Sequence, residues 1–225
     1  MSFRSEFEVE AGHDYEGLSH TSQKPFVIID LIKFRQAGAT LGEVYYQIAK
    51  VSSTHGFPAG ICPTVGIGGH ISGGGIGTLS RKYGTAADNI LNAYFIDVKG
   101  KLHDRKSMGE ELFWALRGGG GASFGVIVSW KIKLVSVPST VTVFNVHKKL
   151  EAGVTILLHK RQNVADKFHA DLFVRAIIQA VDNETKKENY TSFISVSISW
   201  KGQRTTSTNE NEFSDLGWKP KIALK

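Results

Sequence analysis

The stretch Ile61–Gly77, ICPTVGIGGHISGGGIG, decides the fold that we expect for this chain. It holds seven glycines, at positions 66, 68, 69, 73, 74, 75 and 77, and between them stand Val65, Ile67, Ile71 and Ile76. A disordered linker would not carry so many β-branched residues. Glycine lacks a Cβ, so its backbone can approach a ligand closely, and successive exposed amides can hold phosphate oxygens. The stretch indicates either a pyrophosphate-bearing ligand or tight turns between crowded strands.

Two common nucleotide-binding motifs are absent from the sequence. There is no G-x-x-x-x-G-K-[ST], which excludes the phosphate loop of nucleotide triphosphatases. There is also no G-x-G-x-x-G that follows a strand, which disfavours the dinucleotide fold of the usual dehydrogenases. No cluster of cysteine and histidine has metal-ligand spacing, so we expect no metal.

Three side chains near the glycine-rich stretch have reactive chemistry. Cys62 is the only cysteine, so no disulfide within the chain is possible, and a lone cysteine is usually a small buried apolar residue. His70 lies inside the run and can simply hydrogen-bond the loop. His13 lies in a polar turn, Ala11–Gly17, where histidines are often surface residues. From the residues alone, reactive and structural roles both stay open.

The composition is that of an ordinary soluble globular protein, with 41% hydrophobic and 21% charged residues among 225. This length suffices for one large domain or two small ones. The formal net charge of +6 suits an anionic ligand, but the basic residues are scattered, so we expect no nucleic acid partner. No apolar run is long enough to span a bilayer, and the N-terminus lacks the apolar core of a signal peptide.

Hydrophobic spacing predicts mixed secondary structure in the first part of the chain. Phe26–Leu31 is an apolar run typical of a buried strand, and Thr40 with Glu43 forms a capping box for a helix over 41–52. We further expect a strand over 93–98 with a hairpin partner at 101–103, a short helix capped by Ser107 and Glu110 and ending at Arg117, and a strand over 126–134 that buries Val126, Val128, Trp130, Ile132 and Leu134.

The amino-acid composition changes near Pro138, because glycines become sparse after it, so we place a domain boundary there. Beyond it we expect a helix from Val154 to Phe168 and strands over 172–181 and 193–200. After Lys201 the chain is polar and unpatterned, which predicts a loose tail. The predicted fold class is α+β.

Several motifs together resemble the berberine bridge enzyme-like family of plant FAD-linked oxidases. One is Gly12–Ser19 (GHDYEGLS), which is similar to the family's histidine motif. Another is Gly60–Gly77, which is similar to its cysteine motif. The resemblance extends from about Gly12 to Asn183 and includes four further segments, namely Arg81–Gly84, Ala86–Asn89, Asp104–Glu110 and Leu112–Gly125. Trp130–Leu134 and Pro138 close the region that resembles a flavin-binding domain.

The resemblance implies an FAD-binding domain of the vanillyl-alcohol oxidase or PCMH type, built of two α/β subdomains, at residues 1–138. Part of a substrate domain with an antiparallel sheet would follow at 139–225. The resemblance also implies FAD held by two covalent links, at Cys62 and His13. The implied cofactor-binding residues are Gly12, His13, Cys62, Thr64, Val65, Gly66, Gly68, Gly69, His70, Gly73, Gly74, Gly75, Gly77, Tyr83, Gly125 and Val126.

By the same resemblance the protein would be an oxidase that transfers a hydride from an alcohol, carbohydrate or alkaloid-like carbon to FAD, with O2 as acceptor. We expect a small-molecule substrate, no membrane span and a monomer. The family is secreted, or found in the cell wall or in vesicles, but no signal peptide is present here to place this chain.

The sequence departs from the family pattern in several places. Val9–Gly12 stands where Arg-Ser-Gly-Gly is usual, which puts an acidic side chain near the expected cofactor path. Lys33–Gln36 joins the first strand to the helix almost directly, as after a deletion. The family's first flavin-contacting segment and the region that carries its catalytic base are absent, so no catalytic residue is assigned. The alternative hypothesis is a truncated, non-catalytic fragment that binds FAD weakly or not at all.

Overall fold

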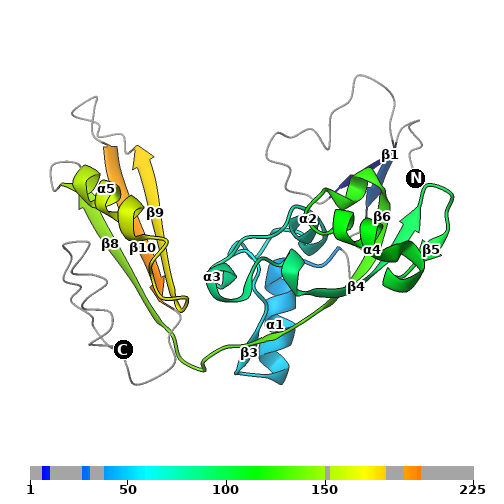
Figure 1. Ribbon diagram of the computed structural model, residues 1–225, viewed down its shortest axis with the longest axis horizontal. Coiled ribbons are helices and arrows are strands. Elements are labelled where there is room, and N and C mark those ends of the chain that lie inside the picture. Colours follow the sequence, from blue (N-terminus) through cyan, green and yellow to red (C-terminus); the bar gives the residue numbers. More distant parts are fainter. Residues whose placement is uncertain (1–6, 11–26, 31–37, 150–152, 181–189, 199–225) are drawn as a thin grey trace. The chain divides into compact units, whose positions relative to one another are not determined.

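The computed structural model describes residues 7–10, 27–30, 38–149, 153–180 and 190–198 (Figure 1). They form two compact units, which divide between Ser136 and Val137. Helices and antiparallel sheets occur in both units, so the predicted α+β class is confirmed.

The strands that the structure describes in the first unit form three small sheets. The pairs are β1 (Phe7–Glu10) with β2 (Val27–Asp30), parallel, and β3 (His55–Gly56) with β7 (Val135–Ser136), antiparallel. The third sheet has β4 (Ile90–Asp97) at its centre, between β5 (Leu102–His103) and β6 (Gly125–Ile132), both antiparallel to it. The predicted first strand therefore forms, as β2.

Four helices and two 3-10 turns lie between these strands along the described part of the unit. They are α1 (Leu41–Val51), α2 (Ile67–Ser72), α3 (Ser80–Tyr83) and α4 (Arg105–Leu116), with 3-10 turns η2 (Ala87–Asn89) and η3 (Gly121–Ser123). The short helices α2 and α3 were not predicted, because glycine-rich sequence carries little helical propensity. Both follow turns inside or just after the glycine-rich stretch.

The capping box predicted for α1 is present. The Thr40 hydroxyl accepts a hydrogen bond from the Glu43 amide at 3.3 Å, and the Glu43 carboxylate accepts one from the Thr40 amide at 2.8 Å. These bonds satisfy amides that the first turn of a helix otherwise leaves without partners. The apolar spacing of the helix then buries Leu41 and Ile48.

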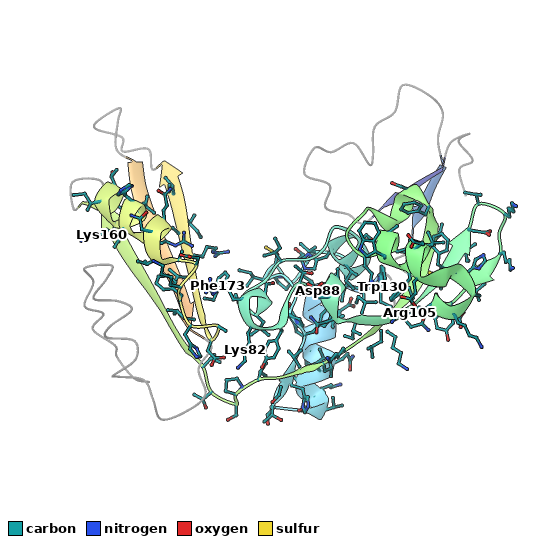
Figure 2. All side chains as sticks on the ribbon, in the orientation of Figure 1. Lys82, Asp88, Arg105, Trp130, Lys160 and Phe173 are labelled. Carbon is teal, nitrogen blue, oxygen red and sulfur yellow. The ribbon has the colours of Figure 1, made fainter. Side chains whose placement is uncertain are left out.

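The capping prediction for α4 was wrong by one turn. Asp104 is the cap, and its carboxylate accepts from the Ser107 amide at 2.9 Å while the Ser107 hydroxyl accepts from the Asp104 amide. Glu110 instead forms a two-armed ion pair with Arg105, whose position is labelled in Figure 2. An aspartate is as good a cap as a serine, so the pattern fitted two registers and the structure takes the earlier one.

The hairpin of β4 and β5 forms as predicted, and the buried face predicted for β6 is right in part: Trp130 and Ile132 pack against the main core, whereas Leu134 is 36% exposed. The residues of β6 that are most buried are Ile127 and Ser129, whereas Val126 and Val128 are only partly covered. The pairing of β4 with β6 shifts register between Tyr94 and Phe95, as at a β-bulge. Such a bulge interrupts the alternation of faces on which the prediction relied.

The main core of this unit lies where α1, α2, α4 and β4 meet. Its buried side chains are Leu41, Ile48, Phe57, Ala59, Ile67, Ile71, Ala86, Ile90, Ala93 and Phe113. A second cluster joins Phe95, Leu116 and Ile127 across the third sheet. The main core thus draws residues from the glycine-rich stretch and from the sequence far downstream of it.

The second unit is a three-stranded antiparallel sheet with one helix. Its strands are β8 (Thr142–Lys149), β9 (Leu172–Ala180) and β10 (Tyr190–Ile198), in the order β8-β10-β9, and its helix is α5 (Val154–Val164). Figure 1 shows α5 lying against this sheet, and the Arg161 guanidinium donates to the Val174 carbonyl at 2.9 Å. The helix and the last two strands were predicted; β8 was not.

Some predictions fall outside the described residues. These are the predicted site residues Gly12 and His13, the suggested deletion at Lys33–Gln36, and the loose tail after Lys201.

Candidate functional site

The loop that carries Cys62 is fixed to the start of helix α1. The Leu41 amide donates to the Val65 carbonyl at 2.9 Å, and the Gly42 amide donates to the Pro63 carbonyl at 2.9 Å. In return, the Ile67 amide donates to the carbonyl of Ala39 at 2.8 Å. The free amides at the beginning of a helix need partners, and here the backbone of the cysteine loop supplies them.

Cys62 itself is exposed and has a free thiol. Its neighbours in the sequence are exposed as well: Ile61 is 53% exposed, and Pro63 and Thr64 are also exposed. The alternative of a small buried apolar cysteine is therefore wrong for this chain. An exposed thiol on a loop whose backbone is held is accessible for chemistry and cannot easily withdraw.

The Gly60 peptide, two residues before Cys62, is bound on both sides. The Tyr45 hydroxyl of α1 donates to the Gly60 carbonyl at 2.6 Å, and the Gly60 amide donates to His70 Nε2 of α2 at 2.8 Å. Because Nε2 accepts, the neutral His70 carries its proton on Nδ1. Burial lowers the pKa of His70 below its usual value, and burial raises the pKa of Tyr45 to about 12.

The glycines of the stretch serve two different needs. A Cβ on Gly75, which has φ of 72°, would lie 2.6 Å from the Ala86 Cβ, and one on Gly77 would lie 1.8 Å from the Ala59 carbonyl oxygen. These two positions are glycine because other parts of the chain pack directly on them. Gly74, with φ of 95°, would have nothing within 4 Å of an added Cβ, although its amide donates to the Ile71 carbonyl and its carbonyl accepts from the Ala87 amide, both at 2.9 Å.

A second glycine-rich segment, Gly118–Gly121, meets the first in space. The Gly120 amide donates to the Ser72 carbonyl at 3.0 Å, and a Cβ on Gly118 would lie 3.8 Å from the Gly74 Cα. The sequence placed both segments among the family motifs but did not predict this contact. The two glycine-rich segments therefore lie side by side at the end of α2.

The predicted site residues that the structure describes differ in exposure. Cys62, Thr64, Gly69 and Gly73 are exposed; Val65, Gly66, Gly68, His70, Gly74, Tyr83, Gly125 and Val126 are partly buried; Gly75 and Gly77 are buried. Two of the predicted site residues that follow the glycine-rich stretch have partners within the protein. The Tyr83 hydroxyl donates to the Ser136 carbonyl, and Gly125 pairs with Asp97 within the third sheet. These contacts give Tyr83 and Gly125 structural roles, and cofactor contact at either stays a prediction.

Two residues with evident roles were missed from the sequence. The sequence placed Tyr45 only within the predicted helix over 41–52, although a partly buried tyrosine hydroxyl needs a partner. Asn89 is 5% exposed, and its side-chain amide donates to the carbonyls of Tyr83 and Thr85 at 2.8 and 3.0 Å. A polar residue directly before an apolar strand was the available signal.

Other kinds of site find no support within the described ranges. No group of three or more His, Cys, Asp or Glu side chains there could hold a metal ion. Nor does any helix in those ranges have the length and apolar character needed to cross a membrane.

These residues fit FAD. The flavin dinucleotide needs backbone that it can approach closely, and Gly74 leaves open the side on which a Cβ would stand. A covalent link needs an accessible nucleophile, and the Cys62 thiol is free and exposed. The residues that would hold the cofactor are therefore the cysteine loop and the two glycine-rich segments.

Comparison with known proteins agrees with this chemistry. Residues 11–105 match the family described as FAD binding domain. The chain is 50% identical to tetrahydroberberine oxidase of Berberis wilsoniae over 93% of its own length and 42% of that protein, and 48% identical to berberine bridge enzyme-like 21 of Arabidopsis thaliana over 92% and 41%. The solved structure of the berberine bridge enzyme-like protein 28 of Arabidopsis thaliana superposes with a TM-score of 0.87 at 44% identity, covering 95% of this chain and 46% of that one.

The fold and site thus define an FAD-binding protein. The chain belongs to the berberine bridge enzyme-like family, and the fold expected from the resemblance is confirmed. It spans about two-fifths of the length of the curated relatives that it matches.

Proposed function

We propose that the chain is the flavin-binding part of an FAD-dependent oxidoreductase and that Cys62 and His13 each carry a covalent link to FAD. The observation that carries this proposal is the exposed thiol of Cys62 on a loop held by α1. A lone cysteine that served only packing would be buried. His13 joins the proposal by its motif, because it lies outside the described residues.

The chain's own residues bind and orient the cofactor in this proposal. The first-turn amides of α1 hold the cysteine loop, and the absence of a Cβ at Gly74 lets the cofactor approach the chain closely there. When bound, FAD supplies hydride acceptance and electron transfer to O2, and two covalent anchors raise its reduction potential by fixing the ring and withdrawing electron density.

The attachment at Cys62 has a balanced stoichiometry. One S–H bond of the thiol and one C–H bond of the flavin ring are replaced by one S–C bond. The two protons and two electrons released go to O2, which becomes hydrogen peroxide. The exposure of Cys62 suits this reaction, since the thiol must reach the ring and lose its proton to solvent.

The proposed reaction is hydride transfer from a CH donor, an alcohol, a carbohydrate or an alkaloid-like molecule, with O2 as acceptor. Two relatives are named for such chemistry, a tetrahydroberberine oxidase and a monolignol oxidoreductase. We assign FAD binding to residues 1–138 and part of a substrate domain to 139–225, and we propose that the protein acts as a monomer. No catalytic base is assigned within this chain.

Covalent flavin is tested by colour. The chain is expressed, precipitated with acid and washed, and the absorbance of the redissolved pellet is measured. We expect a yellow pellet from the wild type, a paler or spectrally shifted one from Cys62→Ala and from His13→Ala, and a colourless one from the double variant. A colourless wild-type pellet would refute both links and would favour the alternative of a fragment that binds FAD weakly or not at all.

Oxidase activity is tested separately from attachment. Yellow protein is mixed with a panel of alcohols, sugars and alkaloids, and hydrogen peroxide is measured. Peroxide with at least one class identifies the substrate type. Yellow protein that yields none with any of them contradicts the oxidase activity for this chain but leaves its flavin binding intact.

A further inference from the structure

Gly60 lies two residues before Cys62, and its backbone sets the direction in which the chain reaches the cysteine. Both of its polar groups are used inside the protein, the carbonyl by Tyr45 and the amide by His70. Gly60 is itself buried, and a Cβ there would lie 2.8 Å from His70 Cε1 and 3.3 Å from Leu41 Cδ1. Side chains from α1 and α2 therefore close on this peptide from two directions.

The chain is fixed again just beyond the cysteine. The Pro63 carbonyl is held by the Gly42 amide and the Val65 carbonyl by the Leu41 amide. Between Gly60 and Pro63 only Ile61 and Cys62 remain, and both are exposed. Because the chain is held on both sides over so few residues, the position of the Cys62 Cα is set by these anchors.

We propose that Tyr45 and His70 are positioning residues for the covalent link at Cys62, because they hold the Gly60 peptide and so fix the path of the chain into the thiol. This inference rests on the proposed function, in which the thiol S–H and a flavin C–H give way to an S–C bond and O2 is reduced to hydrogen peroxide. Neither residue needs to contact the reacting atoms for this role.

The hydrogen bonds of Tyr45 and His70 to Gly60 can be removed by different substitutions. Tyr45→Phe removes one hydroxyl and keeps the ring that packs against the main core, so the Gly60 carbonyl alone loses its partner. His70→Leu removes the acceptor of the Gly60 amide, while His70→Gln keeps an oxygen that can accept in its place. Rescue by glutamine would separate the hydrogen bond from the bulk of the ring.

The main experiment measures the rate of flavin attachment. The flavin-free chain with His13→Ala is incubated with FAD in air, and acid-stable absorbance is followed over time, so that only the Cys62 link is measured. Tyr45→Phe is expected to slow attachment about fivefold, the factor that loss of one hydrogen bond gives. His70→Leu should slow it by at least as much, and His70→Gln should restore part of the rate.

Two matched variants control for simple loss of stability. Tyr46→Phe makes the same chemical change at the next residue, whose side chain is 61% exposed and has no bond to Gly60 among the described contacts. Ile48→Val trims a buried side chain of the same helix. Both should attach flavin at the wild-type rate, even if the second lowers the melting temperature.

A second readout does not depend on flavin. Hydrogen exchange of the flavin-free chain is measured by mass spectrometry in peptides that contain Gly60. Tyr45→Phe and His70→Leu should speed exchange there about fivefold, while Tyr46→Phe should not. Faster exchange only in peptides far from Gly60 would contradict the anchoring.

The outcomes separate this inference from the function beneath it. If the His13→Ala chain without further substitution, the parent chain, never acquires acid-stable flavin, the proposed link at Cys62 is overturned, and this inference with it. A parent chain that acquires flavin, with Tyr45→Phe and His70→Leu loading at the same rate as Tyr46→Phe, overturns the inference alone. Slower loading that Ile48→Val matches would assign the effect to stability and would also overturn it.

Discussion

The segment Gly60–Gly77 and the second unit are held together in opposite ways. In the second unit, β9 and β10 pair without interruption from Leu172 with Ile198 to Ala180 with Tyr190, so the backbone satisfies itself by a regular ladder. In the glycine-rich segment, backbone groups instead bond to other parts of the chain, as Val65 does with Leu41 and Gly60 with His70.

This difference explains where reactive chemistry can be placed. A regular ladder leaves its side chains to alternate between core and solvent, and it presents no backbone to a ligand. A segment that is hydrogen-bonded to the rest of the protein at only a few residues can expose a short stretch between them. Cys62 lies in such a stretch. The same design makes the segment sensitive to the presence of a single Cβ, whereas the second unit is sensitive to the size of its core side chains.

The sharpest test of this contrast is Gly77→Ala. Its new Cβ would lie 1.8 Å from the Ala59 carbonyl oxygen, so backbone must move. We expect a loss of about 4 kcal/mol or more in the free energy of unfolding of the first unit, measured by urea denaturation.

Gly100→Ala is the matched control for that change. Gly100 has φ of 78° but nothing within 4 Å of its Cβ position, so the substitution adds backbone strain without a clash. It should cost only about 1 kcal/mol. Equal losses in both variants would contradict the claim that close approach, and not the backbone angle, requires glycine at 77.

Leu172→Ala probes the other side of the comparison. Leu172 is 0% exposed, and removing most of its side chain should cost about 3 kcal/mol in the second unit. Hydrogen exchange should quicken in peptides from β9 and α5 and stay unchanged in peptides that contain Gly60. Equal acceleration in both places would mean that the two units unfold together.

A smaller effect is expected at Asp88, whose place is labelled in Figure 2. The Thr85 hydroxyl and amide donate to its carboxylate at 2.8 and 2.7 Å and hold the pKa of Asp88 below its ordinary value of 3.8. Since the unfolded carboxyl takes up a proton at a higher pH than the folded one, this stabilisation is complete above 3.8 and is lost as the pH falls through the folded pKa.

The measurement is the melting temperature of the wild type and of Asp88→Asn from neutral pH down to about pH 2.5. The wild type should be the more stable at neutral pH, and the gap should close in acid. A gap that stays constant with pH would show that the Thr85 contacts do not favour the charged carboxylate.

Much of the fold follows from local signals in the sequence. The Thr40 capping box and the apolar spacing behind it specify α1, and a turn at Gly100 specifies the hairpin of β4 and β5. The prediction went wrong where two signals compete. Asp104 and Ser107 are both good caps, and a bulge in the pairing of β4 with β6 interrupts the alternation of buried side chains.

The candidate site was predictable in its residue types but not in its contacts. The lone cysteine and the glycine runs could be read directly, and family resemblance gave them a meaning. Whether Cys62 is buried or exposed depends on how the loop meets α1, and the role of Tyr45 depends on a carbonyl fifteen residues away in sequence. Such contacts between distant segments are decided by packing, and no local pattern encodes them.

The central claim is most directly tested by the mass of one peptide. Wild-type chain is loaded with FAD, denatured and digested, and the peptide that contains Cys62 is weighed. The account predicts that this peptide is joined through FAD to the peptide that contains His13, with the summed mass of both peptides and FAD less four hydrogens, and that its thiol no longer reacts with alkylating reagents. A yellow, acid-stable chain whose Cys62 peptide keeps its unmodified mass and a fully reactive thiol would contradict it.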